Sequence, residues 1–134
     1  MKKPNECYAC FWVRGSFDPD QIPERVGVKP TKSFLEGDPM PNSAVTRKFS
    51  MWALHSRLER SYSLEQHITD VLEQLNANKS AFEQMSNELG GILELVGYFH
   101  SPYPGLVFDR DVVQRLAHHS LSVDFDLYDF ASEE

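Results

Sequence analysis

Residues 121–130 read LSVDFDLYDF and show the cleanest alternation of apolar and polar side chains in the chain. On an extended strand, Leu121, Val123, Phe125 and Leu127 point to one side, and Ser122, Asp124, Asp126 and Tyr128 point to the other. This alternation is typical of a sheet that packs on one face and meets water on the other. The stretch therefore favours an α+β fold, a mainly antiparallel β-sheet with helices packed on one face.

Other stretches of the chain have the composition of strands. Residues 7–15, 49–56 and 92–101 are rich in aromatic and aliphatic side chains and border turn residues, and 106–108 is expected to add a brief strand. Residues 28–48 contain three prolines, one glycine and no helical period. We expect this segment to be a long loop with a short extended piece near Phe34.

Helices are predicted from their start signals. Asp18 precedes Pro19 at a first helical position, Ser63 and Gln66 have the spacing of a capping box, and Asp109 precedes an amphipathic stretch. At 134 residues the chain is expected to form a single domain over 1–134, with frayed ends at about 1–5 and 131–134.

Composition excludes several classes of protein. The net charge is −7 and the basic residues are scattered, so we expect no nucleic-acid partner. No apolar run approaches the roughly 20 residues of a membrane span, and no secretory signal is recognisable, so we expect no membrane association and a cytoplasmic location. The Rossmann, P-loop and nucleophile-elbow motifs are absent, so no cofactor and no catalytic residue is assigned.

The only two cysteines, Cys7 and Cys10, have the C-x-x-C spacing of metal and redox sites. On a strand, positions three apart point to opposite faces of the sheet, so the two sulfurs cannot readily share one zinc ion. A redox pair would lie at the start of a helix, whereas this pair begins a predicted strand. We therefore interpret both as small apolar side chains and predict no metal site.

Aromatic side chains gather on the face of the predicted sheet that alternation assigns to water. The candidate interaction face consists of Tyr8, Trp12, Arg14, Tyr98, Asp124, Asp126 and Tyr128. Tyrosine, tryptophan and arginine are the residues that most often anchor protein interfaces. The alternative is that a helix or the 28–48 loop covers this face and makes it part of the core.

A second candidate is an acid–base or metal cluster. Asp124 and Asp126 would share a face with Glu94 and His100 of the neighbouring strand, and paired carboxylates serve glycoside hydrolysis or bind hard cations. The competing interpretation is that these acids only solvate an open sheet. A third possibility is a small ligand bound beneath the 28–48 loop, which would require an apolar cavity there.

The order of the motifs resembles a bacterial family, domain-of-unknown-function family 4279. The similar segments include FWVRGSFDPDQI, VGVKPT, EGDP, MWALHS, SLEQHI and PGLVFDRDVV, spread over roughly residues 8–130. Pro23 interrupts a helix that the resemblance implies is continuous. The resemblance supports a single α+β domain and supplies no activity or catalytic residue.

The leading hypothesis is therefore a non-enzymatic protein-interaction module that uses the exposed aromatic and acidic sheet face. Its partner would be another protein or a second copy in a homodimer. One version is an immunity-type protein that masks a basic toxin, which the size and acidic charge would suit. A small hydrolase or metal-dependent enzyme and a small-ligand-binding protein remain the alternatives.

Overall fold

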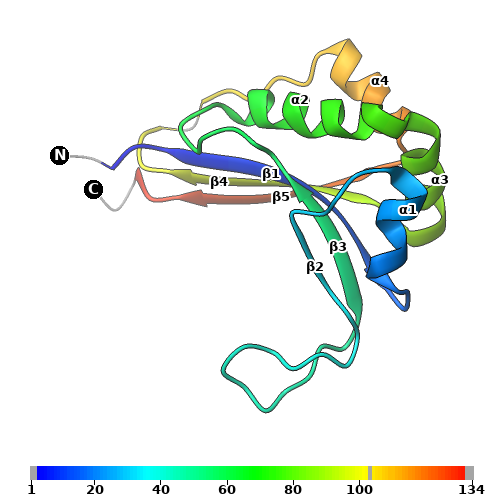
Figure 1. Cartoon of the computed structure of the whole chain (residues 1–134). Coiled ribbons are helices and arrows are strands. Elements are labelled where there is room, and N and C mark those ends of the chain that lie inside the picture. The colour runs from blue at the N-terminus through cyan, green and yellow to red at the C-terminus, as the bar shows by residue number, and fades with distance from the viewer. Residues whose placement is uncertain (1–2, 103, 132–134) are drawn as a thin grey trace.

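A computed structural model describes residues 3–102 and 104–131 as a five-stranded sheet with helices against one face (Figure 1). The elements are β1 (Glu6–Gly15), α1 (Ile22–Val26), β2 (Lys32–Phe34), β3 (Ser50–His55), α2 (Leu64–Leu75), α3 (Lys79–Leu89), β4 (Ile92–Phe99), α4 (Arg110–His118) and β5 (Ser122–Asp129). Short 3₁₀ turns precede α1 and α3. The predicted α+β class is confirmed.

The strand order is β2-β3-β1-β4-β5, so the first strand of the chain lies in the centre. β1 pairs antiparallel with β3 and β4, and β2 pairs antiparallel with β3. β5 pairs parallel with β4, because the chain crosses over the sheet through α4 between these two strands. The sheet is therefore mainly antiparallel, with one parallel pair at an edge.

α2 and α4 begin where the side chains predict, whereas the predicted start at Asp18 and Pro19 begins the 3₁₀ turn that precedes α1. The Gln66 N–H donates to Ser63 Oγ at 3.2 Å, and the Ser63 N–H donates to Gln66 Oε1 at 3.0 Å, which completes the capping box of α2. The Val112 N–H donates to Asp109 Oδ1 at the start of α4. α1 has only five residues and ends at Gly27, whose φ of 74° is left-handed.

The core lies between the sheet and the helices. The strand residues that point toward the helices, on what we call the helix face, include Cys7, Ala9, Phe11 and Val13 of β1, Trp52 and Leu54 of β3, and Leu93, Leu95 and Phe99 of β4. The rings of Phe11, Trp52 and Phe82 contact one another with centroid separations of 5.7–6.4 Å. These contacts fix α3 over the centre of the sheet.

β2 and the chain that joins it to β3 project away from the body. We call residues 32–49, which bend away from β4 and β5 in Figure 1, the arm. Within it, Pro39 and Thr46 form an isolated bridge, and Arg47 lies over the ring of Phe34 at 4.1 Å. No buried member of the core cluster lies between Val26 and Trp52, so the arm depends mainly on its own contacts.

Residues 106–108 form no strand; they run irregularly along the helix face, where Leu106 and Phe108 pack on the core. The frayed ends were placed at 1–5 and 131–134, of which 1–2 and 132–134 lie outside the described residues. Asn5 accepts a hydrogen bond from the His100 N–H at 2.7 Å.

Among the helices described, none has the length and apolar character needed to cross a bilayer.

Candidate functional site

The sheet face opposite the helices is uncovered (Figure 1). We call it the open face; its side chains are Tyr8, Cys10, Trp12 and Arg14 of β1, Met51, Ala53 and His55 of β3, Glu94, Val96 and Tyr98 of β4, and Asp124, Asp126 and Tyr128 of β5. Tyr8, Trp12 and Tyr98 are half-buried and Tyr128 is 41% exposed. The 28–48 loop therefore borders this face and does not cover it.

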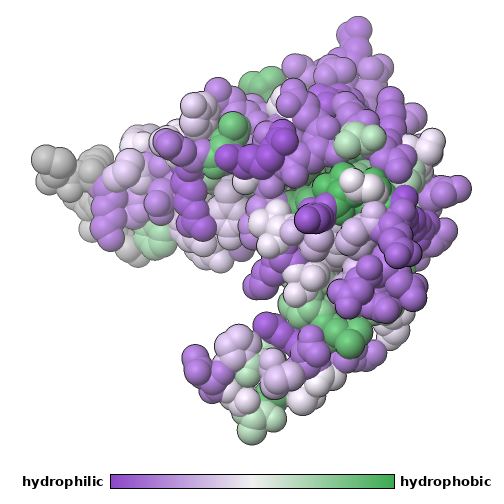
Figure 2. Space-filling view, in the orientation of Figure 1, coloured by the Kyte–Doolittle hydropathy of each residue, from purple (hydrophilic) through white to green (hydrophobic). Residues whose placement is uncertain are grey.

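The open face is hollowed where the arm bends away from the body (Figure 2). The hollow has a volume of about 320 Å³, and its floor includes Cys10, Met51 and Ala53. Trp12 and Phe49 form part of its walls, and the guanidinium of Arg14 lies 4.9 Å from the Trp12 ring and 5.4 Å from the Phe49 ring. Cation–π contacts thus hold a positive charge between two rings.

A second group of stacked side chains lies on the other side of the hollow. The rings of Tyr8 and His55 stack with centroids 6.1 Å apart, and Arg60 lies 4.7 Å from the Tyr8 ring. Burial, followed by the charges of Lys32 and Arg60, lowers the pKa of His55. Burial also raises the pKa of Tyr8. Both rings are therefore neutral near pH 7 and present uncharged faces to the hollow.

Cys10 lies at the floor of the hollow beside a carboxylate. Its Sγ donates to Glu94 Oε1 at 3.6 Å. Burial, the negative charge of Glu94 and this hydrogen bond raise the pKa of the Cys10 thiol to about 12. A thiol with that pKa is protonated near neutral pH, so Cys10 is not a nucleophile.

The structure places the two cysteines on opposite faces, as the strand alternation predicts. Cys7 belongs to the core cluster on the helix face, whereas Cys10 lines the hollow of the open face. Both thiols are free. Among residues 3–102 and 104–131, no group of three or more histidine, cysteine, aspartate or glutamate side chains is arranged to hold a metal ion.

A row of rings continues the open face toward its β5 edge. The rings of Tyr98 and Tyr128 stack with centroids 5.1 Å apart, and Phe130 stacks on both Tyr128 and His100. A hydrogen bond with Asp126 is the main cause that raises the pKa of Tyr128. Each ring of this row thus contacts the next.

The seven residues predicted for the interaction face all lie on the open face, but in two groups. Tyr98 lies opposite Glu6 in the register of β1 with β4, and Trp12 lies opposite Ile92. Trp12 and Tyr98 are therefore separated by roughly 20 Å along the strands, at about 3.3 Å per residue. Tyr8, Trp12 and Arg14 line the hollow, whereas Tyr98 and Tyr128 belong to the ring row. Asp124 and Asp126 lie on β5, the strand that carries Tyr128.

The alternative acid–base cluster is only partly brought together. Glu94 lies opposite Asp124, and Asp126 lies one pleat further along β5. His100 is six positions beyond Glu94, so the strand rise places it roughly 20 Å away. The structure thus groups the three carboxylates and separates the imidazole from them.

Sequence reasoning missed the residues of the arm that form a wall of the hollow. Lys32 and Phe49 line it, and Arg47 and Phe34 stack beside it. Lys32 and Phe34 carry a recognisable signal, since residues two apart on a strand share a face, whereas Arg47 and Phe49 precede β3 and carry none.

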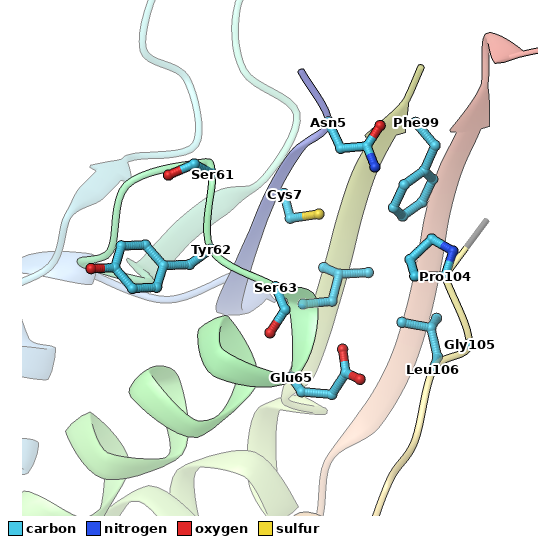
Figure 3. Close-up of a pocket in the computed structure, with 11 residues that line it drawn as sticks. Asn5, Cys7, Ser61, Tyr62, Ser63, Glu65, Phe99, Pro104, Gly105 and Leu106 are labelled. Atoms are coloured by element: carbon cyan, nitrogen blue, oxygen red, sulfur yellow. The ribbon is translucent and has the colours of Figure 1, made fainter. Parts of the chain in front are cut away.

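A smaller pocket of about 230 Å³ lies on the helix face, between the start of α2 and residues 104–106 (Figure 3). Figure 3 shows Cys7 and Glu65 directed toward it. Burial and the nearby charge of Glu65 raise the pKa of the Cys7 thiol. The raised pKa keeps this thiol protonated near neutral pH.

Comparison with known proteins gives one match. A family model described as "Domain of unknown function (DUF4279)" matches residues 5–130. No curated protein and no solved structure matches the chain.

Proposed function

Since the chain belongs to the domain-of-unknown-function family DUF4279, its role has to be inferred from its own surfaces, and we propose that it is a non-enzymatic protein-interaction module that binds a partner on the open face.

The observation that carries this proposal is the uncovered face itself. Every helix of the described chain packs on the other side of the sheet, and the open face carries tyrosine, tryptophan and arginine side chains from β1 to β5. These residue types dominate the binding energy of protein interfaces. A protein domain would ordinarily bury such a face in its core or use it to bind a partner.

The side chains of the open face are already ordered. Arg14 is held between Trp12 and Phe49, and Tyr98 is stacked on Tyr128. Binding normally costs about 0.5–1.5 kcal/mol for each flexible side chain that it immobilises. Stacking before binding reduces that cost, so the arrangement favours recognition over simple solvation.

The charge of the chain favours a basic partner. The net charge is −7, and Glu94, Asp124 and Asp126 place three carboxylates on the open face. Opposite charges raise association rates and disfavour wrong partners. An immunity-type role, in which the chain masks a basic protein, is consistent with this charge; a homodimer would bring like charges together.

A small ligand in the hollow is a second candidate function. The volume of about 320 Å³ is at the lower end of the roughly 300–1,000 Å³ typical of ligand sites. Arg14 and Lys32 on the walls would favour a planar anion. The acid–base or metal enzyme has less support, because His100 lies far from the three carboxylates.

The test is recovery of partners from native lysate by the intact chain and by the Trp12→Ala/Tyr98→Ala double variant, quantified by mass spectrometry. We expect at least one protein to be retained by the intact chain and reduced more than tenfold by the double variant, since each truncated anchor costs about 1 kcal/mol or more. The matched control is Val113→Ser, which alters a 51% exposed side chain on α4, away from the open face. Equal recovery by all three chains, with equal thermal midpoints, would refute the proposal.

A further inference from the structure

β5 is an edge strand of eight residues, Ser122–Asp129, and it pairs only with β4 (Figure 1). The opposite edge of the sheet, β2, has only three residues. Proteins usually shorten, cover or charge an edge strand, because its free backbone groups attract other strands. β5 is long and no described element lies beside it.

The backbone of β5 directs alternate residues outward. The Ser122 N–H donates to the Gly91 oxygen at 3.1 Å, and the Phe130 N–H donates to the Phe99 oxygen at 2.8 Å. In a parallel ladder, alternate residues direct both backbone groups to the same neighbour. The even-numbered residues therefore bond to β4, while Val123, Phe125, Leu127 and Asp129 direct N–H and C=O away from the sheet. Across the described residues, no group bonds to these outward positions.

The two side-chain rows of β5 differ in chemistry. Val123, Phe125 and Leu127 lie on the helix face; Phe125 is 55% exposed and stacks on Phe108 with centroids 6.0 Å apart. Asp124 and Asp126 lie on the open face. One row is thus apolar, with Phe125 as its exposed member beside the half-buried Val123 and Leu127, and the other is acidic.

We propose that the β5 edge accepts an extended segment of another protein as a sixth strand, and that the side chains of this segment alternate between apolar and basic. Strand addition supplies main-chain hydrogen bonds, and the alternating side chains supply specificity. Residues directly opposite each other share a face. Apolar residues of the added strand therefore cover Phe125 and Phe108, and lysine or arginine residues face Asp124 and Asp126.

A second copy of the chain fits this edge poorly. When two β5 strands pair antiparallel about Phe125, Asp124 lies opposite Asp126; when they pair about Asp126, that residue lies opposite itself. Like charges directly opposite each other destabilise a strand pair. The net charge of −7 on each copy adds to this repulsion.

This inference goes beyond the open-face proposal and does not depend on it. The added strand is held mainly by backbone groups of β5 and by Phe125 on the helix face, whereas the open-face proposal rests on Trp12 and Tyr98. Trp12→Ala alone, which changes a side chain of β1 and leaves the stack of Tyr98 on Tyr128 of β5 intact, is therefore expected to bind the added strand as well as the intact chain does.

The probe is an N-acetylated, C-amidated heptapeptide that alternates valine and lysine, titrated into the full chain and followed by NMR amide hydrogen exchange. We expect exchange at Phe125, Leu127 and Asp129 to slow by about tenfold or more at saturation, because their N–H groups gain acceptors. A peptide that alternates valine and glutamate should bind at least tenfold more weakly. Added salt should weaken the binding of the lysine peptide, because it screens the attraction between lysine and aspartate.

Two N-methylated peptides act as matched controls. In an antiparallel pair the valine amides face β5, and in a parallel pair the lysine amides do. One peptide is methylated at its valine amides and the other at its lysine amides. Methylation of the amides that face β5 should abolish binding, and methylation of the other amides should leave the dissociation constant within about twofold.

Three results would overturn the proposal. The first is unchanged exchange at the outward positions at millimolar lysine peptide. The second is equal binding of both methylated peptides, which would show that the backbone is not used. The third is slow exchange at these positions in the free chain together with a dimeric mass, which would make a second copy the occupant.

Discussion

His119 is a buried side chain whose ring makes no hydrogen bond with the described residues. It caps the C-terminus of α4, is fully buried, and neither ring nitrogen has a hydrogen-bond partner among the described residues. Burial, followed by the charges of His118, Lys79 and Arg115, lowers its pKa from 6.5 to about 4. A charged histidine at the C-terminus of a helix complements the negative end of the helix dipole. His118 does contact Glu83 at 3.5 Å, whereas His119 is enclosed as a neutral ring.

This burial predicts a specific acid sensitivity. The folded chain keeps His119 neutral, while the unfolded chain protonates it below about pH 6.5, so the free energy of unfolding falls as pH drops from about 6.5 to 4. At pH 4.5 the loss from this residue should be about 2 kcal/mol. The measurement is urea unfolding at pH 7 and pH 4.5.

The control for this prediction is His119→Leu, which cannot be protonated. Its loss of stability between the two pH values should be smaller than that of the intact chain by about the same 2 kcal/mol. Other acid-sensitive groups, such as Asp70 and His67, remain in both chains and cancel in the difference. Equal losses would show that His119 is protonated without cost in the folded chain.

At the scale of elements, one carboxylate fastens α2 to the end of β3. Asp70 accepts hydrogen bonds from the Arg57 backbone N–H at 2.8 Å and from the Arg57 guanidinium at 2.9 Å. Gln74 donates to the same carboxylate and also to the His55 oxygen. Although burial raises the pKa of Asp70, these hydrogen bonds and the Arg57 charge hold it below its usual range.

We expect Asp70→Asn to lower the free energy of unfolding by about 2 kcal/mol at pH 7, because hydrogen bonds to a charged acceptor are the stronger ones. Glu73→Gln, which changes an exposed carboxylate on the same helix, should stay within about 0.5 kcal/mol of the intact chain. Urea unfolding of both variants checks this. An equal effect of the two substitutions would mean that α2 is held by its apolar stripe alone.

The elements that follow local rules were predictable from the sequence. Alternation places Cys7 and Cys10 on opposite faces because a strand has a period of two, and the Ser63–Gln66 capping box begins α2 because both hydrogen bonds are made within four residues. Residues 106–108 were predicted as a strand, but strand composition alone cannot supply a neighbour with which to pair.

Features set by contacts between distant segments were not predictable. The central position of β1 and the parallel pairing of β5 depend on which strands meet. The alternation of apolar and polar side chains is the same in parallel and antiparallel pairs, so it cannot distinguish them. For the candidate site, periodicity assigned Trp12 and Tyr98 to the correct face. It could not reveal their separation along β1 and β4 or the wall formed by the arm.

At the scale of the whole molecule, the arm is separate from the hydrophobic core. Its exposed side chains include Leu35 and Val45, and beyond Phe34 its contacts with the sheet are few, such as that of Phe49 with Arg14. The arm thus shapes the hollow while the stability of the fold comes from the sheet and helices.

Replacement of residues 38–46 by Asn-Gly should therefore change the free energy of unfolding by no more than about 1 kcal/mol, since shortening a surface loop alters mainly its closure entropy. The flanking pair of Gly37 and Arg47 is retained, so β2 and β3 keep their register. Urea unfolding measures the change. A loss well above 2 kcal/mol would show that the arm helps to hold the core.

The two tryptophans lie on opposite faces of the sheet, Trp52 enclosed beside Phe11 and Phe82 and Trp12 half-exposed beneath Arg14. The chain consequently contains two intrinsic fluorophores that differ in their access to solvent. A dissolved quencher reaches Trp12 and not Trp52, so the quenchable emission reports occupancy of the hollow, while the protected emission reports whether the globule is intact. A titration can thus separate binding from unfolding in one cuvette, without any attached dye.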